Sequence, residues 1–250
     1  MAASAPCRPG PAGRILIVVH QPRSTPGRIG LKLAARGLAL DVRRPCLGEP
    51  LPERLDEHAG VIIFGGPQSA NDTDAYLADE IDLIGRALKQ NAPFLGVCLG
   101  AQMLVRQLGG NVKPHPQGRA EIGYYPIRAT EAGRSLTPDW PSHVYQWHRE
   151  GFDVPAGAAL IAEGDGDFAA QAIRVGDSAL GIQFHPEVTR AMVHRWTTKG
   201  AERLELPGAQ PREAHIMGRL MYDDQVDSWL EAFLDSWLAS DTRALKAAAE

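Results

Sequence analysis

The sequence predicts an α/β protein with a three-layer, doubly wound and mostly parallel sheet flanked by helices. Three observations carry this prediction: apolar β-rich runs recur along the first half of the chain, helical patterns separate them, and glycine turns mark the junctions. The run GVIIFGGP, residues 60–67, is continuously apolar up to its glycine turn. Such a run is typical of a strand buried on both faces, as in a parallel sheet.

The elements of this first half follow in order. RILIVVH at 14–20 predicts a strand rich in β-branched residues, and 60–67 predicts a second. Residues 72–90 predict a helix, because apolar residues recur at helical spacing, with acidic residues early and Lys89 late, as the helix dipole favours. Residues 92–110, APFLGVCLGAQMLVRQLGG, supply the next strand and helix.

The pattern changes near residue 120. Four short segments separated by Gly, Pro and Asp turns predict strands added to the sheet in mixed or antiparallel fashion: 121–128, 143–148, 168–175 and 179–184. Beyond residue 189 the chain predicts a helical C-terminal extension. Within it, six apolar residues share one helix face and are expected to pack on the sheet: Val226, Trp229, Leu230, Phe233, Trp237 and Leu238.

Composition places the chain among single-domain globular proteins. We expect a disordered tail at 1–13 and one domain over 14–250, with 190–250 as its helical part. The net charge of −4 argues against nucleic acid as a partner. No apolar run approaches the roughly 20 residues of a membrane helix, no signal-peptide pattern opens the chain, and three scattered cysteines predict a reducing, cytoplasmic location.

Cys98 is the first candidate for chemistry. Residues 96–100 read G-x-C-x-G, the cysteine counterpart of the G-x-S-x-G turn that holds a nucleophile between a strand and a helix. Small neighbours are needed there because the backbone doubles back on itself. The start of the helix also favours a negatively charged thiolate. A buried structural cysteine is the competing interpretation.

A nucleophilic cysteine needs a base and a group that orients the base. The run ALGIQFHPEV predicts a strand ending in His185-Pro186-Glu187, and residues two apart in an extended chain point the same way. Glu187 could therefore hold the His185 imidazole. Acyl transfer also needs N–H donors for the oxyanion, and Gly66 of the Gly65-Gly66-Pro67 turn, together with Leu99 at the helix start, could supply them.

Taken together, GGP, then GVCLGAQ, then FHPE resemble the class I glutamine amidotransferase family, with a Cys-His-Glu triad. The resemblance covers roughly residues 14–190 and is closest to stand-alone proteins similar to the glutaminase domain of GMP synthase. It implies hydrolysis of a γ-glutamyl amide, glutamine to glutamate and ammonia, through a cysteinyl γ-glutamyl thioester, with no cofactor. It makes Cys98, His185 and Glu187 the triad, and Gly66 and Leu99 the oxyanion donors.

The resemblance also implies substrate contacts. Gln102 would hold the amino-acid end of the substrate, and Gln146, Trp147 and His148 would line the same pocket. Domains of the GMP synthase type usually carry a Ser-His pair where this chain has Trp147-His148. After residue 190 the sequence offers no glycine loop for ATP, so an acceptor of ammonia would be a partner protein in trans, or the ammonia is released.

Other interpretations stay open. The donor could be a γ-glutamyl peptide of the glutathione type, or the chain could be a catalytically silent thiol redox or binding protein. A family of small cysteine hydrolases and chaperones also carries a cysteine elbow, but the F-H-P-E ending favours the amidotransferase. The eight histidines show no metal-binding spacing, so no metal is expected. Arg119, Arg128 and Arg149 could meet a substrate carboxylate or could be solvated loop residues.

Overall fold

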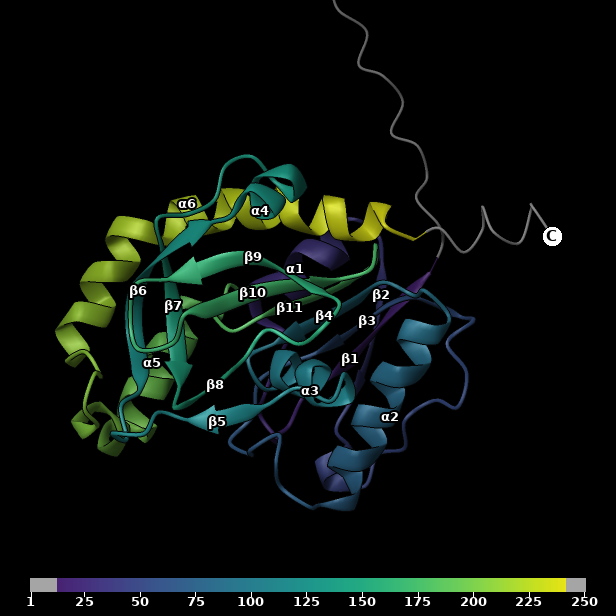
Figure 1. Cartoon of the computed structure of the whole chain (residues 1–250), viewed down its shortest axis with the longest axis horizontal. Coiled ribbons are helices and arrows are strands. Elements are labelled where there is room, and N and C mark those ends of the chain that lie inside the picture. The colour runs from purple at the N-terminus through teal and green to yellow at the C-terminus, as the bar shows by residue number, and fades with distance from the viewer. Residues whose placement is uncertain (1–12, 242–250) are drawn as a thin grey trace, which may run out of the picture.

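A nine-stranded sheet runs through the molecule in the order β2-β1-β3-β4-β11-β10-β9-β6-β7 (Figure 1). The computed structural model describes residues 13–241, so the expected tail lies outside the described residues except for Gly13. The first five strands in that order are parallel. They are β2 (Ala39–Arg43), β1 (Arg14–Val18), β3 (His58–Ile63), β4 (Phe94–Val97) and β11 (Ala179–Ile182).

The other four strands pair antiparallel, as the turn-rich second half of the sequence predicts. They are β10 (Ala170–Val175), β9 (Ala158–Gly164), β6 (Glu121–Ala129) and β7 (His143–His148). A separate two-stranded sheet consists of β5 (Val112–Pro114) and β8 (Glu150–Phe152). The fold class is therefore confirmed: a mixed sheet, parallel on one side and antiparallel on the other, between layers of helices.

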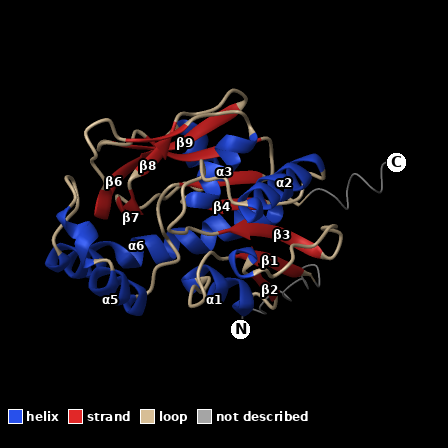
Figure 2. Ribbon diagram, turned by 90° about the horizontal axis from the view of Figure 1, so that it is seen from below, coloured by secondary structure: helices blue, strands red, loops and turns tan. Residues whose placement is uncertain are grey.

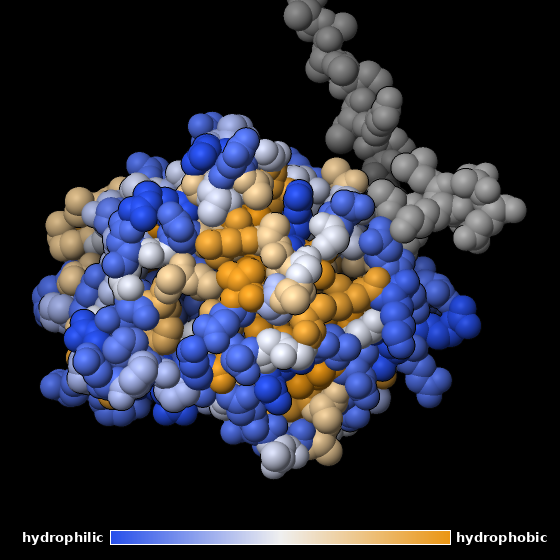
Figure 3. Space-filling view, viewed as in Figure 1, coloured by the Kyte–Doolittle hydropathy of each residue, from blue (hydrophilic) through white to orange (hydrophobic). Residues whose placement is uncertain are grey.

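Helices cover both faces of the sheet (Figures 1 and 2). Alternate side chains of β1 divide between two cores: Ile15 and Ile17 face α1 (Gly27–Ala35) and α6 (Arg212–Ala239), whereas Leu16 and Val18 face the helices of the other side. Those helices are α2 (Ala75–Lys89) and α3 (Leu99–Gln107). On the face seen in Figure 3, hydrophobic residues gather toward the middle and hydrophilic residues surround them.

The C-terminal helix α6 packs on the sheet. Its buried residues Val226, Trp229, Phe233 and Trp237 belong to the same core cluster as the strands of the parallel half, as the shared apolar face predicts. Shorter helices complete the chain: η1 (Pro45–Leu47), α4 (Glu131–Leu136), α5 (Arg190–Lys199) and η2 (Ala201–Glu205).

The carboxyl ends of β1, β3, β4 and β11 meet at one edge of the sheet because these strands are parallel neighbours. The segments that follow them contain His20, Gly65-Gly66, Cys98 and His185. In open α/β sheets, ligands bind in the crevice outside the carboxyl ends of the strands. The topology therefore brings together groups that are far apart in the sequence.

Candidate active site

Cys98 occupies a strained turn between β4 and α3. Its backbone has φ 52° and ψ −104°, a region that non-glycine residues rarely adopt. The turn is held by hydrogen bonds on both sides: the Cys98 N–H donates to the Ile182 carbonyl at 2.8 Å, and its carbonyl accepts from the Gln102 N–H at 3.0 Å. The thiol is thereby fixed at the start of the helix, which is the geometry expected of a nucleophile elbow.

The two glycines of the G-x-C-x-G run are required by close approach. A Cβ atom at Gly96 would lie 2.5 Å from the carbonyl carbon of Gly100, and one at Gly100 would lie 2.1 Å from the Ile63 carbonyl oxygen. Both distances are well inside van der Waals contact. The strand and the helix can approach each other this closely only where both residues lack a side chain.

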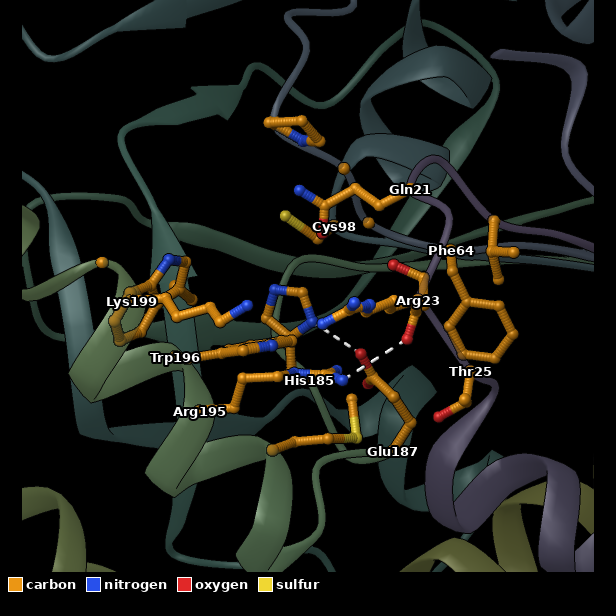
Figure 4. Close-up of a pocket in the computed structure, with 18 of the residues that line it drawn as sticks. Gln21, Arg23, Thr25, Phe64, Cys98, His185, Glu187, Arg195, Trp196 and Lys199 are labelled. Carbon is orange, nitrogen blue, oxygen red and sulfur yellow. Dashed lines mark hydrogen bonds and ion pairs between the residues drawn. The ribbon is translucent and has the colours of Figure 1, made fainter. Parts of the chain in front are cut away.

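His185 and Glu187 meet in the loop after β11. The Nδ1 atom of His185 lies 2.8 Å from Oε1 of Glu187, and both residues are buried. The loop itself is anchored, because the His185 N–H donates to the Tyr145 carbonyl and the Arg28 N–H donates to the Glu187 carbonyl, each at 2.8 Å. The ring of Trp196 packs edge-to-face on the imidazole at 5.1 Å between centroids, which restricts its rotation. Figure 4 shows His185 between Cys98 and Glu187.

The charges around His185 favour its protonated form. Burial by itself lowers the pKa of the imidazole, but the Glu187 carboxylate and the neighbouring Cys98 sulfur outweigh burial and raise the pKa to about 10. The pocket therefore favours an imidazolium that faces a carboxylate on one side and the sulfur on the other. Such an ion pair is suited to nucleophilic attack followed by proton donation.

The Gly65-Gly66 turn after β3 lies against the same group. A Cβ atom at Gly65 would lie 2.8 Å from Cε1 of His185, so only glycine leaves room for the imidazole; the same Cβ would make an ordinary contact of 3.8 Å with Sγ of Cys98. Gly66 lines the pocket beside Cys98. Leu99 is the first residue of α3, and the amide of a first helical residue has no acceptor within its helix. The N–H groups of Gly66 and Leu99 thus belong to the two backbone segments that flank the thiol.

Of the four predicted substrate contacts, one lies at the pocket. Trp147 lines the pocket, whereas Gln102, Gln146 and His148 are not among its lining residues. The amide of Gln102 donates to the Glu150 carbonyl at 2.9 Å, and that of Gln146 donates to Gln171 at 2.6 Å.

His148 is also engaged away from the pocket. Its Nδ1 atom bonds the Glu150 carbonyl at 3.0 Å, and its Nε2 atom lies 3.2 Å from a Glu121 carboxylate oxygen. Gln146 and His148 lie on one face of β7 and Trp147 on the other, because side chains alternate along a strand. The structure therefore places only Trp147 of these four residues at the pocket.

The three arginines singled out in the sequence lie elsewhere. Arg119 bonds Asp167 at 2.7 Å, Arg128 pairs with Asp165 and Glu163 on an exposed edge, and Arg149 is exposed. None of them lines the pocket. Their interpretation as surface residues is the one that the structure supports.

The pocket of about 460 Å³ draws its outer wall from segments that the sequence analysis did not single out. The loop after β1 contributes Gln21 to Thr25, and α5 with η2 contributes a second wall: Met192, Arg195, Trp196, Lys199, Gly200, Glu202 and Arg203. Spacing could have revealed the helical part. Met192, Arg195, Trp196 and Lys199 lie at i, i+3, i+4 and i+7, one face of a helix that directly follows the His-Pro-Glu run.

Among residues 13–241, no group of three or more His, Cys, Asp or Glu side chains is arranged to hold a metal ion. None of the helices described in this range is both long and apolar enough to span a membrane.

Known proteins of one family resemble this chain in sequence and in fold. The sequence model of the family described as "Glutamine amidotransferase class-I" matches residues 31–196. A glutamine amidotransferase-like protein, YfeJ, from Salmonella typhimurium is 32% identical over 185 residues, which cover 70% of this chain and 76% of that protein. A GMP synthase (glutamine-hydrolyzing) from Neisseria gonorrhoeae is 34% identical over 164 residues, or 61% of this chain, and the match spans only 28% of that synthase.

The solved structure of a glutamine amidotransferase from Methylobacillus flagellatus superimposes with a TM-score of 0.84 at 27% identity. The superposition covers 92% of this chain and 95% of the Methylobacillus flagellatus chain. The family model alone matches more than half of the chain and contains the elbow, the glycine turn and the His-Pro-Glu run. The chain therefore belongs to the class I glutamine amidotransferase family.

Proposed function

We propose that this protein hydrolyses a γ-glutamyl amide, glutamine in the first place, with Cys98 as nucleophile, His185 as acid and base, and Glu187 as the group that orients His185. The observation that carries the proposal is the convergence of the strained Cys98 turn with the 2.8 Å His185–Glu187 pair in one pocket. Family membership supports the same chemistry.

In the first half of the reaction the Cys98 thiolate attacks the amide carbon. A C–S bond forms, the carbonyl π electrons move to oxygen, and the N–H groups of Gly66 and Leu99 donate hydrogen bonds to the oxyanion. When this intermediate collapses, the C–N bond breaks and the His185 imidazolium gives its proton to the departing amine. Ammonia leaves and a γ-glutamyl thioester remains on Cys98.

In the second half the neutral imidazole acts as a base. His185 takes a proton from water while the oxygen of that water attacks the thioester carbon. The second tetrahedral intermediate collapses with cleavage of the C–S bond, which returns the thiolate and releases glutamate. The imidazolium is restored beside Glu187, so protons and electrons balance over the cycle.

Measuring glutamate and ammonia together tests this proposal. Purified protein given glutamine should release both products in equal amounts, and Cys98→Ala should reduce turnover at least about a thousandfold. An acceptor for the ammonia, where the reaction feeds one, would lie outside residues 13–241. Full activity in Cys98→Ala would contradict the mechanism, and release of neither product by the wild type from any γ-glutamyl amide would contradict the function.

A second candidate substrate, a γ-glutamyl peptide of the glutathione type, is favoured by the charge of the pocket wall. Four cations line it, namely Arg23, Arg195, Lys199 and Arg203, although the whole chain carries a net charge of −4. Of the described residues, no carboxylate forms an ion pair with any of these four. A γ-glutamyl peptide would place its terminal carboxylate among these cations. The side-chain amide of glutamine carries no such carboxylate on its leaving side. Comparing kcat/KM for glutamine and for γ-glutamylglycine separates the two candidates.

A further inference from the structure

A second histidine–carboxylate pair lies behind the proposed oxyanion hole. The Nε2 atom of His20 lies 2.7 Å from Oε2 of Glu80, and both side chains are completely buried. The Nδ1 atom of the same imidazole lies 3.3 Å from the carbonyl oxygen of Gly65. Neither His20 nor Glu80 lines the pocket, so the pair touches no substrate.

Glu80 occupies an unusual position for an acid. It lies on the buried face of α2 in register with Leu77, Leu83, Ile84 and Ala87. A carboxyl group in such a core is costly unless it is paired. Its other oxygen, Oε1, has no hydrogen-bond partner among the described residues. The hydrogen bond of Oε2 with His20 is therefore the polar contact that pairs this carboxyl group.

The hydrogens of this group can be assigned from chemistry. A carbonyl oxygen only accepts hydrogen bonds, so the Nδ1 atom of His20 carries a hydrogen and donates it to Gly65. Glu80 completes the arrangement at Nε2, either by accepting a second N–H or by donating its own carboxyl hydrogen. In both cases Glu80 keeps the imidazole oriented with its Nδ1–H toward the Gly65 carbonyl.

The Gly65 carbonyl and the Gly66 N–H are two ends of one planar peptide unit. A hydrogen bond that fixes and polarises the carbonyl also fixes the direction of the N–H and makes it a stronger donor. The approach of His20 to this unit is close: a Cβ atom at Gly66 would lie 2.7 Å from Cβ of His20. The side chain thus packs on the peptide as well as bonding to it.

We propose that His20 and Glu80 are positioning residues that hold the Gly65–Gly66 peptide with its N–H directed at the developing oxyanion. This proposal rests on the proposed function, because an oxyanion forms only if Cys98 attacks an amide. The pair acts through the peptide rather than on the substrate. Its contribution should therefore be to kcat, where the oxyanion develops, and not to KM.

Two substitutions of the same residue test the proposal. In His20→Asn the amide nitrogen falls near the position of Nδ1 and can still donate to the Gly65 carbonyl. In His20→Gln the longer side chain carries its amide to the position of Nε2 beside Glu80 and leaves the carbonyl without its donor. We expect kcat to fall about ten- to a hundredfold in His20→Gln, with KM within about threefold of wild type, and to stay within about threefold in His20→Asn.

A matched control exists in the same sheet. His58 and Asp41 form another histidine–carboxylate pair, partly buried, with 3.1 Å between Nε2 and Oδ2, and neither residue lines the pocket. His58→Gln should lose about as much thermal stability as His20→Gln, yet leave kcat unchanged. Alkylation of Cys98 by iodoacetamide, which develops no oxyanion, should proceed at the wild-type rate in all three variants.

Equal kcat values for His20→Gln and His20→Asn would overturn the proposal, and so would a matching loss of Cys98 alkylation in His20→Gln. The chemical shift of the Gly66 amide proton gives a test without turnover: His20→Gln should move it upfield, and His20→Asn and His58→Gln should not. If the wild type hydrolyses no γ-glutamyl amide, the proposed function fails. The positioning of the peptide by His20 is then supported or rejected by this resonance alone.

Discussion

The Nδ1 atom of His185 and the Oε1 atom of Glu187 lie 2.8 Å apart in the turn that follows β11, with a single proline between the two residues. This contact orients the imidazole so that its other nitrogen is free to serve the thiol. Pro186 fixes its own backbone φ within the turn that contains Glu187, and the Val188 N–H donates to the His185 carbonyl at 3.4 Å across it. The local sequence therefore builds the pair, and the sheet carries it to Cys98.

Removing the charge of Glu187 should weaken this arrangement without removing its shape. In Glu187→Gln we expect the pKa of His185 to fall from about 10, because the carboxylate is the largest influence that raises it. We expect kcat for the γ-glutamyl amide to fall about a thousandfold, since the amide no longer stabilises the imidazolium. NMR titration of the imidazole and steady-state kinetics measure the two effects. Glu202→Gln, in the same pocket wall, is the control; an unchanged His185 pKa in Glu187→Gln would contradict the prediction.

Stability should depend on pH through His185. Its pKa is raised from 6.5 to about 10 in the folded protein, so between these values the folded state holds a proton that the unfolded chain has released. The stabilisation is thus complete below about pH 6.5 and is lost as the pH rises toward 10, by at most about 1.4 kcal/mol per unit for one proton. Urea unfolding of wild type and His185→Gln across this range measures it. A constant difference between the two proteins at all pH values would contradict the assignment.

The elbow glycines should be intolerant of a methyl group. Gly100→Ala places Cβ 2.1 Å from the Ile63 carbonyl oxygen, so we expect a loss of about 3 kcal/mol in the free energy of unfolding. Gly85→Ala in α2 is the matched control, because its Cβ would meet only the flexible end of Gln107 and alanine favours a helix by about 1 kcal/mol. Denaturant unfolding compares the two; similar stabilities would show that the strand and helix can separate at the elbow.

The cationic wall should discriminate between substrates. Replacing Arg195 and Lys199 together by Gln should raise KM for γ-glutamylglycine about tenfold and leave KM for glutamine within about twofold, because only the peptide brings a second carboxylate to these side chains. Arg128→Gln, on an exposed edge away from the pocket, should affect neither substrate. Equal changes in KM for the two substrates would show that these cations bind the glutamyl part that both substrates share, and would contradict the prediction.

Sequence patterns predicted what depends on short-range geometry. The turn at Cys98 follows from its two glycines. The His185–Glu187 pair is present, but not for the predicted reason: β11 already ends at Ile182, and the pair meets in a turn rather than in an extended chain. Of the predicted substrate contacts, only Trp147 lines the pocket. A motif position could not show that the Gln102 amide is taken by Glu150, nor that one residue of β7 faces the pocket while its neighbours face away.

By itself the sequence determined the α/β class, the parallel first half of the sheet and the family, and it singled out the residues of the proposed triad, because each depends on local spacing and on residue type. Only the tertiary structure decided which side chains surround the triad. The α5 cations and the His20–Glu80 pair come from segments on both sides of the sheet, and parallel strands bring those segments to one edge. Contacts between residues 60 or more positions apart depend on strand order and helix packing, which no short motif encodes.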